Sequence, residues 1–179
     1  MAQKEIPCYL FVGMLESGKT KFIQETMEDP QFDSGDKTLL LICEEGEEEY
    51  DSERFAFGGV TVATIEDKAE LNREHLQQLA EKSDCGRVII EYNGMWLVQE
   101  LYDIWDNLNQ SRMLVIVDDL SIPLGDFRLK GNGSNGGHNG LGNIQQLIGQ
   151  QYARLRMGIG ADFQRGAQVD WVLGKYSAE

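Results

Sequence analysis

The feature that most constrains the fold is a glycine loop that joins an apolar run to an amphipathic stretch, over residues 10–23. The loop reads Gly-Met-Leu-Glu-Ser-Gly-Lys-Thr and fits the pattern GxxxxGK[ST] at every specified position. A strand, a glycine loop and a helix in this order bring backbone N–H groups and the positive end of the helix against an anion. The stretch therefore predicts a phosphate-binding site formed by Gly13, Glu16, Ser17, Gly18, Lys19 and Thr20.

Two side chains of this loop carry distinct chemistry. Lys19 is expected to reach a β- or γ-phosphate, and Thr20 offers its hydroxyl to Mg²⁺. The alternative is a strand-to-helix turn that binds no ligand.

Apolar runs and helical patterns alternate along most of the chain, which predicts an α/β fold with three layers, α/β/α, around a mostly parallel central sheet. Strands are expected at 7–12, 38–43, 60–64, 87–91, 113–117, 126–130, 154–160 and 171–173, and helices at 18–29, 67–82, 96–109 and 140–150. The length of 179 residues favours one domain over residues 1–179.

The charge balance is strongly acidic, with Asp+Glu 30 against Lys+Arg 16 and a net charge of −14. Such a surface repels RNA and DNA, so no nucleic-acid partner is expected. No apolar run reaches the roughly 18 residues of a membrane span, and no membrane association is expected. Three widely spaced cysteines and the lack of an apolar N-terminal segment predict a cytoplasmic protein.

Carboxylates follow two of the expected strands. Residues 44–51 are the most acidic segment, and Glu91 ends the strand at 87–91. At the carboxyl ends of parallel strands, Glu44 and Glu91 would lie near Thr20 and could hold a divalent metal. The alternative for the acidic segment is a solvated loop.

Residues 6 to about 110 resemble the CobW-like GTP-binding proteins. The resemblance rests on residues 12–20, 43–47 and 89–96. It implies Mg²⁺ with GTP as cofactor. It also implies that Glu44 and Glu47 match the family's switch carboxylates and that Glu91 matches its second acidic site. The guanine-reading Asn-Lys-x-Asp segment is not found, so GTP or another nucleotide is expected to bind with reduced affinity.

Residues 113 to about 176 resemble bacterial peptidyl-tRNA hydrolase. The resemblance rests on residues 117–120, 123–125, 136–141, 154–160 and 172–175. It implies that Asp118 orients a catalytic histidine and that Asn139 helps to bind substrate. No histidine of residues 1–112 matches that catalytic residue, so His138 is assigned to the loop, and Asn139 is expected to cap the helix at 140–150.

The two resemblances meet in the strand at 113–117, and each covers part of its family. We therefore expect a recombined or designed chimera of segments 1–112 and 113–179, which binds a nucleotide or phosphate ion weakly and is not an enzyme. The alternatives are a scaffold without biochemical function, a residual GTPase and a residual peptidyl-tRNA hydrolase. Glu47 and Asp118 would be inherited catalytic residues, and Asp118, His138 and Asn139 remnants of a hydrolase site. Nucleotide preference, oligomeric state and natural origin are left open.

Overall fold

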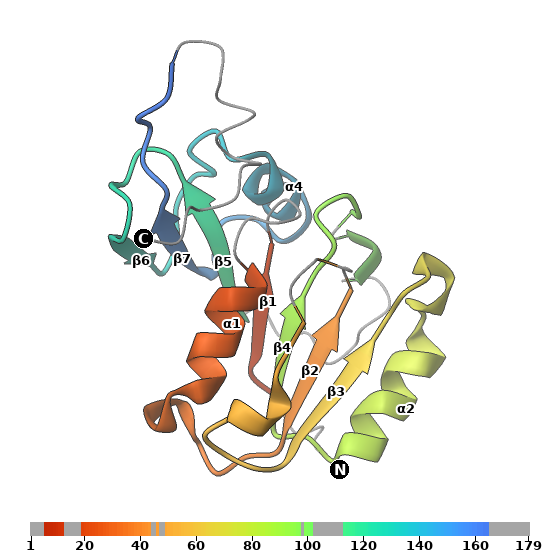
Figure 1. The fold of residues 1–179 in the computed structure, drawn as a ribbon. Coiled ribbons are helices and arrows are strands. Elements are labelled where there is room, and N and C mark those ends of the chain that lie inside the picture. The colour runs from red at the N-terminus through yellow and green to blue at the C-terminus, as the bar shows by residue number, and fades with distance from the viewer. Residues whose placement is uncertain are drawn as a thin grey trace.

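In a computed structural model, the described residues are 6–12, 19–43, 46, 49–97, 99–101 and 113–164. Seven strands form one sheet in the order β3-β2-β4-β1-β5-β7-β6. Every described pairing is parallel except that of β6 with β7. The predicted α/β fold with a mostly parallel central sheet is confirmed (Figure 1).

The strands follow the apolar runs of the sequence closely. Their bounds are Cys8–Phe11 (β1), Thr38–Ile42 (β2), Val60–Thr64 (β3), Arg87–Glu91 (β4), Met113–Asp119 (β5), Phe127–Lys130 (β6) and Ala153–Gly158 (β7). β2 and β4 lie inside the sheet and are buried along almost their whole length, as continuous apolar runs require. β6 is an edge strand, and all four of its residues are exposed.

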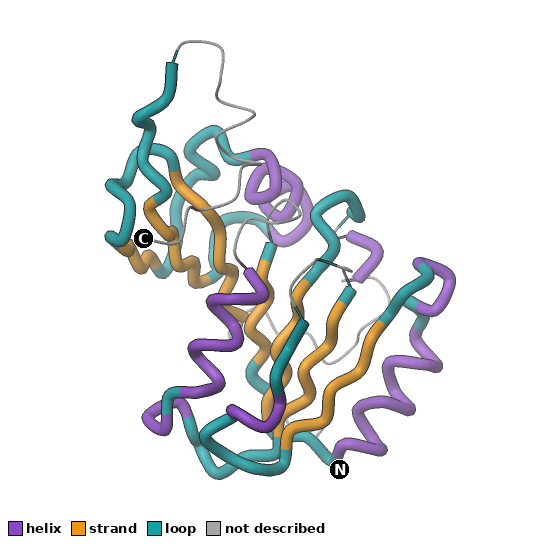
Figure 2. Tube along the Cα trace, in the orientation of Figure 1, coloured by secondary structure: helices purple, strands orange, loops and turns teal. Residues whose placement is uncertain are grey.

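Helices cover both faces of the sheet, as Figure 2 shows. Their bounds are Lys19–Glu28 (α1), Arg73–Ser83 (α2) and Asn139–Ile148 (α4). On one face, Ile23 and Met27 of α1 pack on a cluster that includes Phe11, Leu40 and Ile116. On the other face, α2 and α4 pack on alternate residues of the same strands. Since successive side chains of a strand point to opposite faces, each central strand supplies both layers.

Residues 99–101 are helical, but most of the expected helix at 96–109 and the expected strand at 171–173 lie outside the described residues.

The strand β5 extends two residues beyond the predicted end at residue 117, because β7 pairs with it as far as Asp119. At that end Gly158 allows a very close approach. A Cβ atom on Gly158 would lie 1.9 Å from the carbonyl oxygen of Pro123. The loop after β5 therefore folds directly onto β7.

Candidate active site

Polar side chains gather where β1 and β5 end side by side at the carboxyl edge of the sheet. From β1 the chain passes through α1 to β2 on one side of the sheet, whereas β5 pairs with β1 on the other side. Ligands of open α/β sheets bind where the strand order changes direction in this way. Asp118 near the end of β5 lies at this point.

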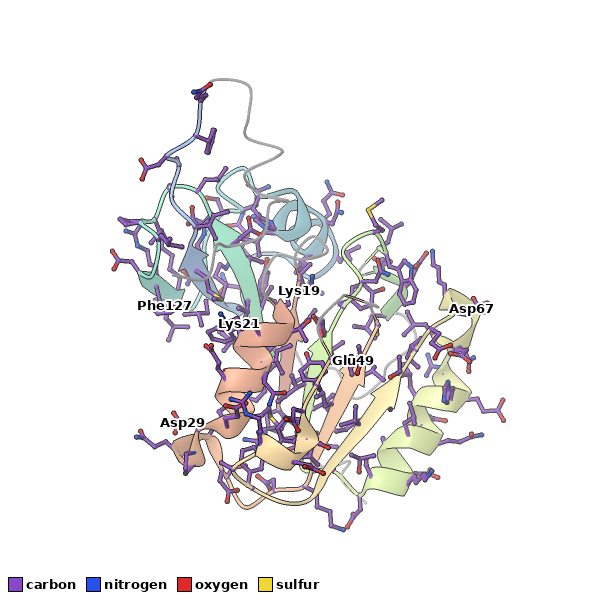
Figure 3. All side chains as sticks on the ribbon, viewed as in Figure 1. Lys19, Lys21, Asp29, Glu49, Asp67 and Phe127 are labelled. Atoms are coloured by element: carbon purple, nitrogen blue, oxygen red, sulfur yellow. The ribbon has the colours of Figure 1, made fainter. Side chains whose placement is uncertain are left out.

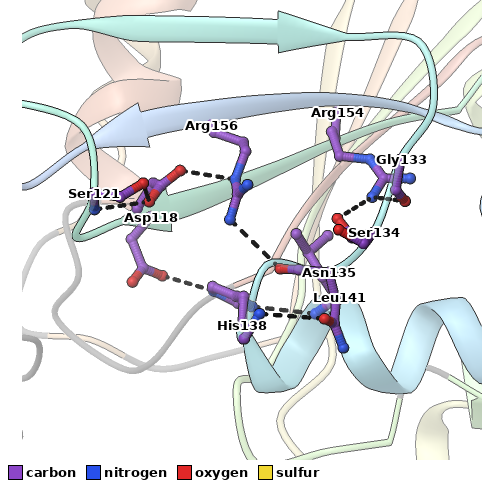
Figure 4. A network of polar contacts seen from close by, with 11 residues as sticks. Asp118, Ser121, Gly133, Ser134, Asn135, His138, Leu141, Arg154 and Arg156 are labelled. Carbon is purple, nitrogen blue, oxygen red and sulfur yellow. Dashed lines mark hydrogen bonds and ion pairs between the residues drawn. The ribbon is translucent and has the colours of Figure 1, made fainter.

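Asp118 forms a close pair with His138, which precedes α4. The Nε2 atom of His138 lies 3.1 Å from Oδ1 of Asp118 (Figure 4). The two side chains are 18% and 17% exposed, so the pair is shielded and still open to a small molecule. Asp118 thus has a histidine partner although no histidine of residues 1–112 matched one, because the loop before α4 folds back over the end of β5.

The hydrogen bond at the second ring nitrogen of His138, Nδ1, determines the tautomer of the neutral imidazole. Nδ1 of His138 accepts a hydrogen bond of 3.1 Å from the backbone N–H of Leu141 and so caps the helix. An acceptor nitrogen carries no proton, so the neutral ring holds its proton on Nε2 and donates it to Asp118. His138 is the N-cap of α4, and the expected cap at Asn139 is wrong; the side chain of Asn139 lies outside what the structure describes.

Two opposing effects set the acidity of Asp118. Burial alone would raise the pKa of Asp118. The hydrogen bond from His138 and the electrostatic attraction of its ring, a backbone hydrogen bond and the Lys19 ammonium outweigh it and lower the pKa below its ordinary value. The carboxylate is therefore ionised at neutral pH.

Arginines of β7 hold the loop that carries His138. Arg156 Nε lies 2.8 Å from Oδ2 of Asp119, and its Nη2 reaches the carbonyl of Asn135 at 3.4 Å. Arg154 donates from Nη1 to the carbonyls of Gly133 and Ser134 at 2.7 and 3.2 Å. The sequence pattern gave no sign that Arg154 is fully buried or that Arg156 is largely covered, because strands in the core of a protein seldom carry arginine.

A pocket of about 240 Å³ opens beside Asp118, between α1 and the strands β5 and β7. Its walls are largely apolar, and the charged side chains that line it are Lys19, Lys21, Glu25 and Asp118. Figure 3 shows Lys21 of α1 and Phe127 of β6, which both line the pocket.

The predicted phosphate loop is described in part. Lys19 and Thr20 form the start of α1, and Lys19 is 8% exposed, whereas residues 13–18 lie outside the described residues. Phosphate binding by these residues stays a prediction.

Thr20 and Glu91 meet as predicted for neighbouring strand ends. Oγ1 of Thr20 donates to Oε1 of Glu91 at 2.7 Å, and the hydroxyl of Tyr50 donates to Oε2 at 2.6 Å. Burial and the Glu91 carboxylate raise the pKa of Tyr50. Glu44 and Glu47 lie outside the described residues, and the described part of the chain contains no group of three potential metal ligands. The metal role of Thr20, Glu44 and Glu91 is untested.

The fold and site thus define an α/β protein with a carboxylate–imidazole pair at the carboxyl edge of its sheet. Residues 46–179 match the family model described as Peptidyl-tRNA hydrolase. The chain belongs to the peptidyl-tRNA hydrolase family.

Curated relatives agree with this assignment. The chain is 52% identical over 85 residues to the peptidyl-tRNA hydrolase of Parabacteroides distasonis, and this alignment covers 47% of this chain and 42% of that protein. It is 53% identical over 75 residues to the peptidyl-tRNA hydrolase of Phocaeicola vulgatus, and this alignment covers 41% of this chain and 40% of that protein. These matches span less than half of the length of the curated relatives.

A solved structure agrees in fold. The crystal structure of a peptidyl-tRNA hydrolase variant from Acinetobacter baumannii aligns with a TM-score of 0.51 and 20% identity, over 99% of this chain and 80% of that one.

These findings correct several predictions. The family match runs from residue 46 through the predicted junction at 112/113, so the chimera, the designed scaffold and the separate GTP-binding part are unsupported. The prediction of a nucleotide-binding protein that is not an enzyme is wrong, since the relatives are enzymes. The exclusion of a nucleic-acid partner is also wrong, because the relatives are named for a substrate that contains tRNA. Net charge is a sum over the whole chain, whereas RNA meets a local surface. None of the described helices is long and apolar enough to cross a membrane.

Proposed function

We propose that this chain hydrolyses the ester bond of peptidyl-tRNA and that Asp118 activates the attacking water. The observation that carries the proposal is the Asp118–His138 pair, which lies within the family match and beside an open pocket. The proposed reaction needs water as co-reactant and no bound cofactor. The whole chain would act as one domain, since its seven described strands share one sheet.

Asp118 is the better base because both ring nitrogens of His138 are engaged. His138 Nε2–H holds one carboxylate oxygen, and Nδ1 accepts from Leu141. His138 thus acts as a positioning residue that fixes the carboxylate toward the pocket. Asp118 would take a proton from water as the water oxygen attacks the ester carbonyl. The bond between the carbonyl carbon and the ribose oxygen would then break, and the ribose oxygen would take this proton from Asp118 and leave as a hydroxyl. Because its pKa is lowered, Asp118 is a weak base, and we expect slow turnover.

Local positive charge supports a substrate that contains RNA. Lys19 and Lys21 line the pocket, and Arg128 and Lys130 lie on the exposed strand β6. Cations at these places can meet phosphates although the chain carries a net charge of −14. The three cysteines, Cys8, Cys43 and Cys85, are buried as thiols, which supports a cytoplasmic location.

The test is release of N-acetyl-amino acid from N-acetyl-aminoacyl-tRNA by wild type and variants prepared in parallel. Asp118→Asn should lower kcat/KM roughly 100-fold or more, whereas Asp126→Asn, on an exposed loop residue, should leave it unchanged. Equal rates for wild type and Asp118→Asn would contradict the proposal. Parallel preparation also controls for hydrolase from the expression host.

The pH dependence identifies the base. With Asp118 as base, kcat/KM stays level from pH 8 to pH 5 and falls only below about pH 4. A fall centred near pH 6.5, the ordinary pKa of histidine, would instead assign the base to His138. His138→Asn keeps a good helix cap while it removes the Asp118 partner, and should lower kcat by about 10-fold. The matched control is His75→Asn on α2, where the half-buried imidazole lies away from Asp118 with its Nδ1 atom 3.1 Å from the carbonyl oxygen of Glu70.

A further inference from the structure

We infer that the pocket beside Asp118 is a specificity site for an apolar side chain of the residue esterified to tRNA. The inference rests on the proposed function and adds a substrate class to it. Asp118 lies in the pocket wall, so a group bound there is adjacent to the proposed reacting centre. The side chain attached next to the ester carbonyl is the part of the substrate that can occupy this pocket while the carbonyl lies beside Asp118.

The inner wall is apolar and firmly packed. Phe11 and Ile116 belong to the buried core and are 4% and 5% exposed. The ring of Phe22 in α1 stands 5.8 Å from that of Phe11, measured between centroids. These residues come from β1, β5 and α1, whose positions the central sheet fixes. The wall therefore offers a preformed hydrocarbon surface.

The mouth of the pocket consists of side chains that the fold leaves in water. Leu124 is 64% exposed and Phe127 is 58% exposed. Both line the pocket, together with Met157, whose flexible thioether adapts to different shapes. Covering the two exposed side chains with an apolar ligand removes apolar surface from water, which favours binding.

Size and chemistry favour a side chain over the terminal adenine of tRNA. A cavity of roughly 150 Å³ suffices for benzene, so about 240 Å³ accommodates a benzyl or isobutyl group. The described residues that line the pocket include no amide or hydroxyl side chain. A buried adenine would lack neutral partners for its ring nitrogens, whereas a hydrocarbon side chain needs none.

The experiment compares N-acetyl-phenylalanyl and N-acetyl-glycyl esters on one and the same tRNA. Wild type should prefer the phenylalanyl ester in kcat/KM by about 10-fold or more, as burial of a whole apolar side chain allows. Leu124→Asp puts a carboxylate at the mouth and should reduce this preference by at least about 5-fold. Leu129→Asp is the matched control, because Leu129 is 68% exposed on β6 and does not line the pocket.

The outcomes separate this inference from the proposed function. Hydrolysis of both esters at equal rates would overturn the specificity site and leave the proposed function intact. If neither ester is hydrolysed, the proposed function fails, and binding is measured by NMR with N-acetyl-phenylalaninamide and N-acetyl-glycinamide. Stronger binding of the phenylalanyl compound, weakened by Leu124→Asp, supports the pocket. Equal binding of the two amides, or binding of AMP in their place, overturns it.

Discussion

Replacing Arg154 by methionine tests the idea that a buried cation holds the loop before His138. The Arg154 side chain is fully buried at 0% exposure. Its guanidinium donates to the carbonyls of Gly133, Ser134 and Gln150 at 2.7, 3.2 and 3.1 Å and lies 4.2 Å from the ring centroid of Tyr152. Arg154→Met fills a similar volume, removes the charge and leaves three carbonyls without these donors.

The expected loss follows from opposing contributions. Hydrogen bonds from a charged donor contribute about 1.5 kcal/mol or more each, and the cation–π contact about 1 kcal/mol. The variant regains part of this, because a buried guanidinium costs several kcal/mol in lost hydration. We expect the free energy of unfolding to fall by about 3 kcal/mol, at the scale of a broken buried polar network.

Urea unfolding followed by circular dichroism measures this loss. For a slope of about 2 kcal/mol per M, the midpoint should fall by about 1.5 M. Arg154→Lys keeps the positive charge but lacks the planar guanidinium, and its urea midpoint should lie between those of wild type and Arg154→Met. Arg128→Met on exposed β6 is the matched control and should change stability by less than about 0.5 kcal/mol. A loss below about 1 kcal/mol for Arg154→Met, or one equal to that of the control, would refute the reasoning.

Three further predictions concern acidity, packing and thiol reactivity. Because the folded pKa of Asp118 is lowered, its ionisation stabilises the fold above about pH 4, and this contribution is lost as the pH falls through the folded pKa. Asp118→Asn should therefore lower the urea midpoint at pH 7 and differ less from wild type at pH 3; a constant difference would contradict this. Gly158→Ala should cost about 3 kcal/mol because of the Pro123 carbonyl, whereas Gly131→Ala, with nothing within 4 Å, should cost less than about 0.5 kcal/mol in the same unfolding assay. Burial and the neighbouring Cys85 raise the pKa of Cys8 to about 12, so a thiol reagent at pH 8 should label Cys8 slowly in the native protein and rapidly in urea, as mass spectrometry would show. Rapid native labelling would mean that Cys8 is accessible.

The sequence predicted the layers of the fold well. It did not predict which residues of the second half of the chain contact one another. Periodicity located the centre of the sheet because the continuous apolar runs of β2 and β4 are buried on both faces. The glycine loop directed attention to residues 13–20 and to nucleotides, and the family match then overturned that function. The resemblance grouped Asp118, His138 and Asn139 as remnants of a hydrolase site, and the structure brings Asp118 and His138 together, although we had assigned no chemical role to His138.

Local patterns of this sequence determined which segments become strands and helices, because burial period and turn residues act over a few positions. The pairing of Asp118 with His138 was decided by tertiary structure, since 20 residues separate them and the bond depends on how the loop folds back over β5. The same holds for Arg154, whose carbonyl partners Gly133 and Ser134 lie about 20 residues away. A one-dimensional pattern records hydrophobicity and spacing, whereas a site requires side chains from distant segments to meet at hydrogen-bonding distance.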